Sequence, residues 1–298
     1  MADVSRRELL AGSLGLLGVA KLGHRGEFTA PPPPCPPADR LRQSVARWIY
    51  ESIPLPEFCR RSKEMGLAGI DLLQPDEWPK AQDAGLVCTM AYPSRRDDFI
   101  ATGFNNPANW PLLLGELEQT IPLAARAGIP NVITMFGNRR GMSDTEGMSN
   151  CITGLAKIAP LAESEGVTVC VELLNSKVDH HDYMGDHTAF GVAVVKGVNS
   201  PRVKLLYDIY HMQIMEGDII RTIRDDIQSI GHFHTGGVPG RGDLDDTQEL
   251  QYRAICQAIV DTGYQGYVAH EFVPRADPLA ALRQAVALCN VAPSSGAK

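Results

Sequence analysis

The sequence predicts an α/β protein built as a (β/α)₈ barrel, a single domain in which eight parallel strands alternate with helices. From residue 43 onward, short apolar runs alternate with longer segments of helical period, which is typical of repeated βα units. The apolar runs contain few polar residues, which indicates strands buried on both faces under a ring of helices. A doubly wound open sheet ranks second, because no glycine-rich phosphate turn follows the first run and polar residues end several later ones.

Eight strand candidates can be counted along the barrel. They cover residues 44–49, 69–73, 86–91, 131–136, 167–173, 203–208, 229–235 and 266–272. Helix candidates lie between them at residues 55–65, 110–127, 145–165, 218–228, 250–262 and 278–289. A glycine that turns the chain back toward the next strand should end four of these helices, at Gly66, Gly128, Gly166 and Gly263.

The first 42 residues differ in composition and are predicted to lie outside the barrel. Arg6 and Arg7 precede an apolar, glycine-rich run over 9–20, which is the layout of a twin-arginine export signal. This run is too short to cross a bilayer, and the proline tract at 31–37 indicates an extended spacer. The expected parts are a signal-like segment with a linker (1–42), the barrel (43–292) and a tail (293–298). The signal predicts export to the periplasm, with a cytoplasmic location as the alternative.

The composition of the 298-residue chain excludes some partners. Apolar residues make up 44% and charged residues 21%, which is typical of a soluble globular protein without stable membrane association. The 28 basic residues against 35 acidic ones give a net charge of −7, so we expect no nucleic-acid partner. The seven cysteines show no CxxC spacing and are interpreted as mostly buried thiols. A homo-oligomer is compatible with these features.

Four successive strand candidates end in an ionisable side chain. These residues are Glu172, Asp208, His234 and Glu271. Because the active site of such a barrel lies at the C-terminal ends of its strands, the four side chains can converge on one mouth. Three carboxylates and one imidazole suit a single divalent metal such as Mn²⁺, Mg²⁺ or Co²⁺, which would also relieve the repulsion among the acids. The alternative is that each acid caps a helix or pairs with a basic residue.

Three histidines near these strand ends need separate assignment. His232 and His234 point to the same side of one strand, so parity alone allows either to be the ligand. His234 is preferred because it lies nearer the strand end. His270 points away from the side on which Glu271 lies and is expected to be a packed residue.

The second half of the chain contains four distinctive motifs. They are YDIYHMQ at 207–213, GHFH at 231–234, VPGR at 238–241 and GYQGY at 263–267. Together they resemble the motifs of hydroxypyruvate isomerases, within the xylose isomerase-like superfamily of sugar isomerases and epimerases. The likeness covers roughly residues 43–292 and is strongest over 167–274. It implies a barrel enzyme with a metal held by Glu172, Asp208, the residue at 234 and Glu271.

The resemblance also implies substrate contacts by His211 and Arg241. His211 is expected on the turn that leaves its strand, with a surface-loop position as the alternative, and Arg241 can donate two hydrogen bonds to one substrate edge. Lys177 and His180, together with His181, lie in the loop after Glu172 and are further candidates for contacting substrate, although a solvated loop position is equally compatible.

The sequence departs from the hydroxypyruvate isomerase pattern in two places. Those enzymes usually carry glutamine where this chain has His234, whereas the related ketose 3-epimerases carry histidine. The segment GDLDD at 242–246 replaces the usual His-Glu-Pro. The exact substrate therefore stays open at this point.

The expected function is a divalent-metal-dependent isomerase that interconverts a small hydroxy-aldehyde and hydroxy-ketone through an enediolate. Glu172 and Glu271 are the candidates that move the proton. One alternative is a ketose 3-epimerase, which returns the proton to the opposite face of the same carbon. Another is a barrel that binds a sugar or metal without turnover. An endonuclease would need more zinc-ligating histidines and a basic groove.

Overall fold

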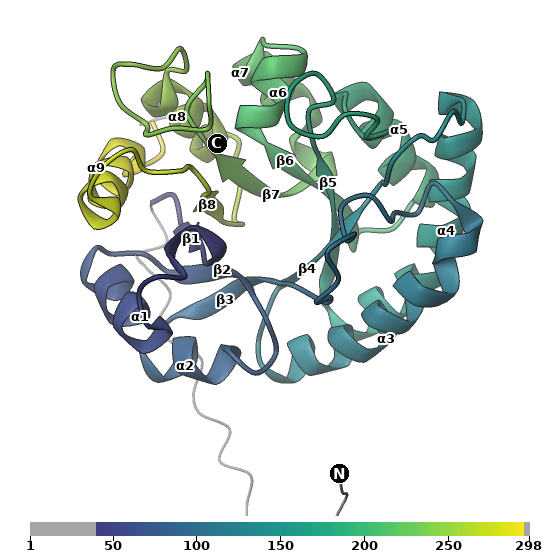
Figure 1. Cartoon of the computed structure of the whole chain (residues 1–298), viewed down its shortest axis with the longest axis horizontal. Helices are drawn as coiled ribbons and strands as arrows, with labels where there is room; N and C mark the ends of the chain where they lie inside the picture. Colours follow the sequence, from purple (N-terminus) through teal and green to yellow (C-terminus); the bar gives the residue numbers. More distant parts are fainter. Residues whose placement is uncertain (1–39, 295–298) are drawn as a thin grey trace, which may run out of the picture. The chain divides into compact units, whose positions relative to one another are not determined.

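The computed structural model describes residues 40–294, and within them the chain forms one closed barrel of eight parallel strands in sequence order (Figure 1). The open-sheet alternative is therefore wrong. The strands are β1 (Gln43–Ala46), β2 (Gly69–Leu73), β3 (Val87–Ala91), β4 (Asn131–Met135), β5 (Thr168–Leu173), β6 (Val203–Asp208), β7 (Ile230–Thr235) and β8 (Val268–His270). β8 pairs with β1 and closes the barrel.

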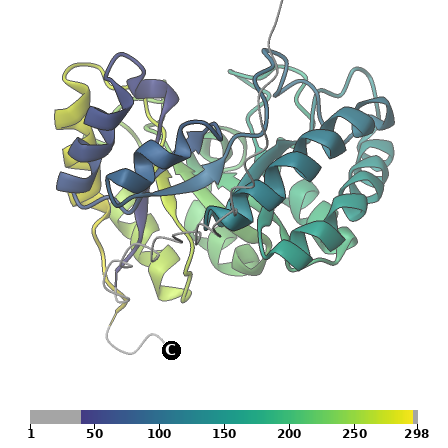
Figure 2. The same cartoon turned by 90° about the horizontal axis from the view of Figure 1, so that it is seen from below.

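Helices surround these strands, as the two perpendicular views show (Figures 1 and 2). They are α1 (Leu55–Glu64), α2 (Trp78–Asp83), α3 (Trp110–Arg126), α4 (Asp144–Glu165), α5 (Thr188–Val198), α6 (Ile209–Met215), α7 (Ile219–Asp226), α8 (Tyr252–Asp261) and α9 (Pro278–Cys289). Three 3₁₀ turns add to them, at Trp48–Tyr50, Pro107–Asn109 and Ile227–Ser229. Every strand residue except four lies buried, which explains the nearly continuous apolar runs in the sequence.

The eight predicted strands are all present, with differences at the first and last. β1 stops at Ala46, because the chain leaves the barrel there and winds into the 3₁₀ turn Trp48–Tyr50. β8 is also shorter than predicted, so Glu271 follows the strand directly. Three helices were not predicted. Two of them, α2 and α6, have only six and seven residues, and α5 is rich in valine and glycine, which are weak helix formers.

The predicted glycine stops are present at the helix ends. Gly166 is the left-handed C-cap of α4, with φ 70°. Gly66, Gly128 and Gly263 also have positive φ values just after α1, α3 and α8. Because only glycine enters this region without cost, these positions let the chain reverse toward the next strand.

Gly69 opens β2 at a point where no side chain fits. A Cβ atom there would lie 2.3 Å from the carbonyl oxygen of Val87 and 2.5 Å from a methyl of Thr89. We expect Gly69→Ala to lower the free energy of unfolding by about 1–3 kcal/mol, because β2 and β3 must move apart. Urea denaturation measures this change. Gly115→Ala is the matched control, since its Cβ would meet open space in α3 and should leave stability equal or higher. Equal stability of both variants would contradict the close packing of β2 on β3.

The cysteine prediction is confirmed where the structure describes it. Six cysteines are free and buried, and Cys35 lies outside the described residues. The twin-arginine segment and the proline tract also lie outside them, so export stays a prediction. Among residues 40–294, no helix combines the length and apolar character needed to cross a bilayer.

Candidate active site

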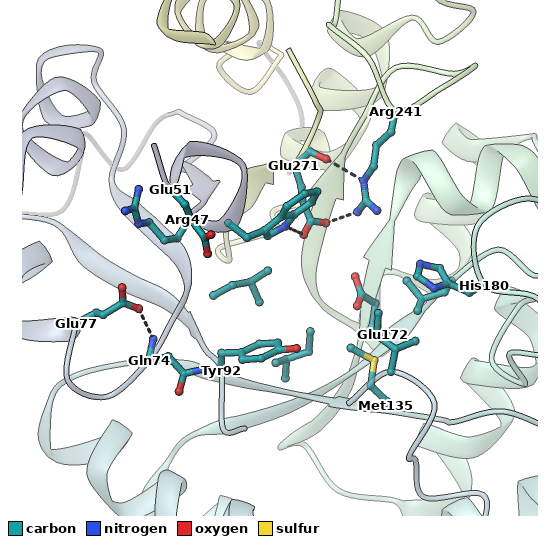
Figure 3. Close-up of a pocket in the computed structure, with 15 residues that line it drawn as sticks. Arg47, Glu51, Gln74, Glu77, Tyr92, Met135, Glu172, His180, Arg241 and Glu271 are labelled. Atoms are coloured by element: carbon teal, nitrogen blue, oxygen red, sulfur yellow. Dashed lines mark hydrogen bonds and ion pairs between the residues drawn. The ribbon is translucent and has the colours of Figure 1, made fainter. Parts of the chain in front are cut away.

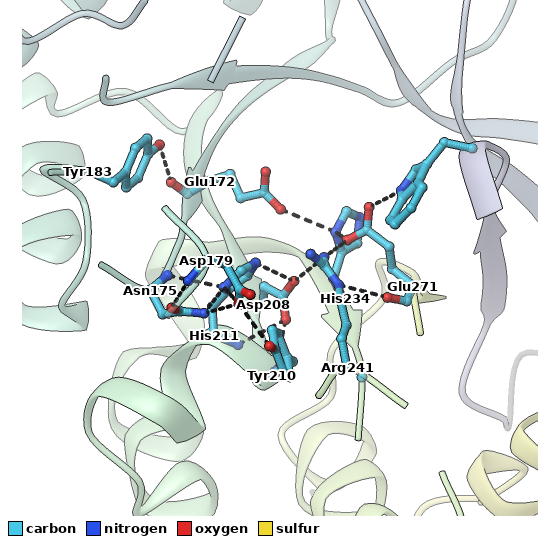
Figure 4. A network of polar contacts seen from close by, with 12 residues as sticks. Glu172, Asn175, Asp179, Tyr183, Asp208, Tyr210, His211, His234, Arg241 and Glu271 are labelled. Atoms are coloured by element: carbon cyan, nitrogen blue, oxygen red, sulfur yellow. Dashed lines mark hydrogen bonds and ion pairs between the residues drawn. The ribbon is translucent and has the colours of Figure 1, made fainter. Parts of the chain in front are cut away.

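Glu172, Asp208, His234 and Glu271 come together at the C-terminal mouth of the barrel (Figure 4). One ligand atom from each lies within 4.8 Å of those from the others, and all four residues are buried. They come from the ends of β5 to β8, and the register of the sheet pairs Asp208 directly with His234. Parallel strands thus gather four residues that are distant in sequence, as their strand-end positions predicted.

The ring of His234 is oriented by a carboxylate that sequence reasoning did not assign to the site. Its Nε2–H donates to Oδ2 of Asp71 at 2.8 Å. Its Nδ1 atom then faces the acids, 2.7 Å from Oε2 of Glu271 and 3.3 Å from Oε1 of Glu172. This buried Nδ1 makes no hydrogen bond of acceptable geometry to the described residues. An Nδ1 atom that faces several carboxylates, with the other ring nitrogen held by an acid, is the arrangement of a metal-ligating histidine.

Asp71 contacts both histidines of β7, and these three residues form a second buried cluster of potential metal ligands. His232 donates from Nε2 to the same Asp71 oxygen, at 3.1 Å, and its ring does not join the group of four. The preference for His234 over His232 therefore agrees with the geometry. Thr89 completes the shell by donating its hydroxyl to Oδ1 of Asp71. The signal that could have revealed Asp71 is a lone carboxylate in the middle of the apolar strand β2.

We expect Asp71→Asn to weaken binding of a divalent metal by about 10- to 100-fold, since its carboxylate fixes the tautomer of His234. Isothermal titration with Mn²⁺ measures the change. Asp76→Asn is a matched control, because Asp76 is exposed and pairs with Arg95 on the surface. Equal Mn²⁺ affinity in the wild type and both variants would show that Asp71 does not orient the ligand.

Cationic groups hold the buried carboxylates together. Burial raises the pKa of Asp208 to about 7, although the guanidinium of Arg241 opposes this shift. Burial likewise raises the pKa of Glu271, but His234 and Arg241 outweigh it and bring the value to about 2. Burial lowers the pKa of His234, yet Glu271 and the other acids raise it well above its usual range. The site therefore favours positive charge, which fits the three-carboxylate donor set to a divalent cation.

Arg241 reaches into the site from the loop after β7. Its terminal nitrogen donates to Oδ2 of Asp208 at 3.0 Å and to Oε2 of Glu271, while Nε donates to the carbonyl of Glu271 at 3.0 Å (Figure 4). The guanidinium also lies over the ring of Tyr210, with 5.3 Å to its centroid. Arg241 therefore sits beside the proposed ligands, where a substrate contact was expected.

His211 occupies the first turn of α6 and is fully buried, so the surface-loop alternative is wrong. Its Nδ1 accepts a hydrogen bond from the backbone N–H of Asn175 at 3.1 Å. Its Nε2, 3.5 Å from Oδ2 of Asp208, makes no hydrogen bond to the described residues. Burial, aided by Arg241, lowers the pKa of His211 well below its usual value, so the ring is neutral. A neutral imidazole with a free N–H can donate to a substrate oxygen.

A cavity of about 450 Å³ opens beside the group of four (Figure 3). Glu172, His180, Arg241 and Glu271 line its polar side, and Figure 3 shows the two glutamates pointing into it. The other walls combine apolar residues with a second polar group. The apolar residues include Leu72, Tyr92, Ile100, Ile133, Met135 and Leu174, and the polar group is Arg47, Glu51, Gln74 and Glu77 (Figure 3). Such a pocket can hold one small molecule with its polar end at the carboxylates.

The remaining candidates for substrate contact lie in the loop after β5, and of these His180 lines the cavity whereas Lys177 and His181 do not. His180 lines the cavity next to Glu172, and burial lowers the pKa of its imidazole (Figure 3). Lys177 instead donates from Nζ to the carbonyls of Ile214 and Met215 at the end of α6, 3.0 Å in each case, and does not line the cavity. His181 is exposed with Nδ1 near a backbone carbonyl, and His270 is packed between Gln43 and Thr235 as expected.

Trp48, in the 3₁₀ turn after β1, is a site residue that sequence reasoning missed. Its side chain is 44% exposed and lines the cavity, yet its indole Nε1–H donates to Oε1 of Glu271 at 2.6 Å. No sequence signal marked it, because the first predicted strand, 44–49, contains Trp48, whereas β1 ends at Ala46.

The fold and the site define a TIM-barrel protein with a polar centre of three carboxylates and one histidine at the C-terminal mouth. The model of the Xylose isomerase-like TIM barrel family matches residues 60–290. The chain belongs to this family.

Curated relatives are named as isomerases or as a 3-epimerase. A "putative hydroxypyruvate isomerase" of Mus musculus is 27% identical over 249 residues, covering 79% of this chain and 90% of the relative. A "2-oxo-tetronate isomerase" of Cupriavidus necator is 36% identical over 131 residues, covering 44% of this chain and 50% of the relative. These similarities place the chain among enzymes of the isomerase class.

Solved structures confirm the fold. A family 2 AP endonuclease from Brucella melitensis superposes with a TM-score of 0.72 at 23% identity, over 81% of this chain and 97% of that one. A D-psicose 3-epimerase determined in the presence of D-fructose superposes with a TM-score of 0.63 at 20% identity, over 78% and 85%. At these identities the likeness concerns the barrel alone.

Proposed function

We propose that this protein isomerises a small hydroxy-carbonyl compound through an enediolate, with one divalent metal in its active site. The observation that carries the proposal is the convergence of three carboxylates and the Nδ1 of His234 beside a cavity for one small molecule. The isomerase names of its relatives support the same reaction class.

The proposed ligands are Glu172, Asp208, His234 and Glu271, and Mn²⁺, Mg²⁺ or Co²⁺ suits their oxygen-rich set. When bound, the cation supplies Lewis acidity for the oxygens on which negative charge develops.

Residues of the chain itself would transfer the proton and bind the substrate. Glu172 lines the cavity, and its Oε2 has no partner among residues 40–294, so this oxygen can take a proton from the carbon next to the carbonyl. Arg241 lines the same cavity and can donate to substrate oxygens, whereas His211 is buried beside Asp208 and does not line the cavity. His180, as a neutral imidazole at the wall, can both donate and accept a hydrogen bond.

A ketose 3-epimerase is the second candidate function. The cavity of about 450 Å³ falls within the range of pockets that enclose a whole small molecule, so it admits substrates longer than three carbons. Histidine at position 234 agrees with the ketose 3-epimerase pattern rather than the hydroxypyruvate isomerase one.

Incubation in D₂O with Mn²⁺ tests the function across substrates of different chain length. Hydroxypyruvate, 2-oxo-tetronate and D-fructose would each be offered, followed by mass spectrometry and NMR of the products. We expect at least one of them to gain deuterium at the carbon next to its carbonyl and to yield an isomer. If Mn²⁺-loaded protein forms no isomer of any of these compounds and exchanges no deuterium into them, the proposed function is contradicted.

A further inference from the structure

Four glutamates line the cavity, and the two of them that are proposed ligands, Glu172 and Glu271, differ in how their oxygens are engaged. Oε1 of Glu271 accepts the indole N–H of Trp48 at 2.6 Å, and its Oε2 accepts a hydrogen bond from Arg241 and lies 2.7 Å from Nδ1 of His234. Oε1 of Glu172 lies 3.3 Å from the same Nδ1, and its Oε2 is unpartnered within the described part of the chain. Only one of the two carboxylates therefore presents an uncommitted oxygen to the cavity.

This asymmetry bears on the stereochemistry of proton transfer. A carboxylate oxygen that already accepts a short hydrogen bond is a poorer proton acceptor, because protonation would weaken that bond. Epimerisation at one carbon needs a proton removed from one face and another delivered to the opposite face, which takes a competent group on each side. An isomerisation that moves a carbonyl along the chain can return the proton on the face from which it left.

We infer that Trp48 is a positioning residue that holds Glu271 out of the proton transfer, so that Glu172 alone carries the proton and isomerisation prevails over 3-epimerisation. The inference rests on the proposed function and deepens it. Trp48 suits this role because its backbone belongs to the short 3₁₀ turn after β1, and because the Arg241 guanidinium lies 5.8 Å from its ring centroid. The indole is therefore held beside the carboxylate that it restrains.

The proposed proton transfer needs no reactant other than the substrate and the carboxylate of Glu172. Oε2 of Glu172 takes the proton from the hydroxyl-bearing carbon, and the C–H electron pair becomes the C=C bond of the enediolate. The former carbonyl oxygen takes the negative charge. The same carboxyl returns the proton to the neighbouring carbon, and the remaining hydroxyl hydrogen passes from one substrate oxygen to the other, which leaves the carbonyl moved by one position.

The hydrogen bond itself can be measured without turnover. The chain has three tryptophans, and Trp48→Phe identifies the indole signal of Trp48 in a ¹H–¹⁵N spectrum of the full-length protein. We expect this signal to lie downfield and to exchange slowly with solvent, with or without the diamagnetic cation Mg²⁺, although the side chain is 44% exposed. Glu271→Gln should move the signal upfield. A Trp48 indole that exchanges as fast as a free one would overturn the inference.

Product analysis then tests the consequence for the reaction. With D-fructose in D₂O and Mn²⁺, we expect wild-type protein to form aldose, and Trp48→Phe to raise the ratio of 3-epimer to aldose by about tenfold or more, which corresponds to about 1.4 kcal/mol between the two pathways. Trp110→Phe is the matched control, because it removes an indole donor to the carbonyl of Phe104, far from the carboxylates in sequence and outside the cavity lining.

The outcomes separate the inference from the proposed function. If wild-type protein turns over D-fructose mainly to the 3-epimer, or if Trp48→Phe leaves the product ratio unchanged, the inference fails while the enzyme class stands. If wild-type protein forms no isomer of D-fructose, hydroxypyruvate or 2-oxo-tetronate and exchanges no deuterium into them, the proposed function fails, and the one-carboxylate assignment fails with it.

Discussion

Glu172→Gln is expected to lower kcat by about 10²- to 10⁴-fold, and further where metal is also lost, while the barrel stays folded. The physical reason is that an amide at this position has no basic oxygen to take the substrate proton, although it has nearly the same shape. Glu172 stands at the end of β5, where all residues are buried, so the substitution keeps the packing of the strand. The measurement is the initial rate with the best substrate from the D₂O screen, at saturating Mn²⁺.

Two controls distinguish loss of the base from other causes of a lower rate. Glu118→Gln changes an exposed glutamate of α3 in the same way and should leave the rate unchanged. Metal content, measured on the same samples, separates loss of the base from loss of the cation. Wild-type rates in a Glu172→Gln variant that holds its metal would remove Glu172 from the role of base.

The second large effect is expected in the Glu172→Ala, Asp208→Ala double variant. Wild-type protein should carry close to one equivalent of a divalent metal, and the double variant should carry almost none, because two of the four ligands are gone. Elemental analysis after gel filtration measures this. Metal should also stabilise the wild type against heat and leave the double variant unaffected, since only a folded site that binds it shifts the unfolding equilibrium.

Glu163→Ala, Asp225→Ala is the matched control for charge, since both acids are exposed. It should bind metal like the wild type. Wild-type protein that takes up no Mn²⁺, Mg²⁺ or Co²⁺ on titration would contradict the proposed metal centre.

The strand positions and the four carboxylate and imidazole side chains at the mouth could be predicted from the sequence, because both follow from local patterns. A buried parallel strand is an apolar run, and the barrel places the end of every run at one mouth. Glu172 and Asp208 each close such a run, so their convergence follows from the fold itself and not from any particular long-range contact.

The supporting residues could not be predicted, because their roles depend on contacts between distant segments. Asp71 and His234 are 163 residues apart, and Trp48 and Glu271 are 223 apart. Nothing in the local sequence around Trp48 shows that its indole faces a carboxylate of the last strand. Lys177 shows that a position near the site can also mislead. Its place in the loop after Glu172 made it a candidate for a substrate contact, whereas its hydrogen bonds connect that loop to α6.

The barrel divides the site between the two halves of the chain. The four proposed ligands lie at the ends of β5 to β8, whereas most of the apolar wall comes from β2 to β4 and the loops that follow them, through residues such as Leu72, Tyr92 and Ile133. Substitutions that reshape the wall therefore need not touch the atoms that hold the cation. Substitutions in the first half of such a barrel can therefore change its substrate range during evolution while the second half retains the metal ligands. For the same reason, a laboratory library aimed at substrate range should be confined to the first half.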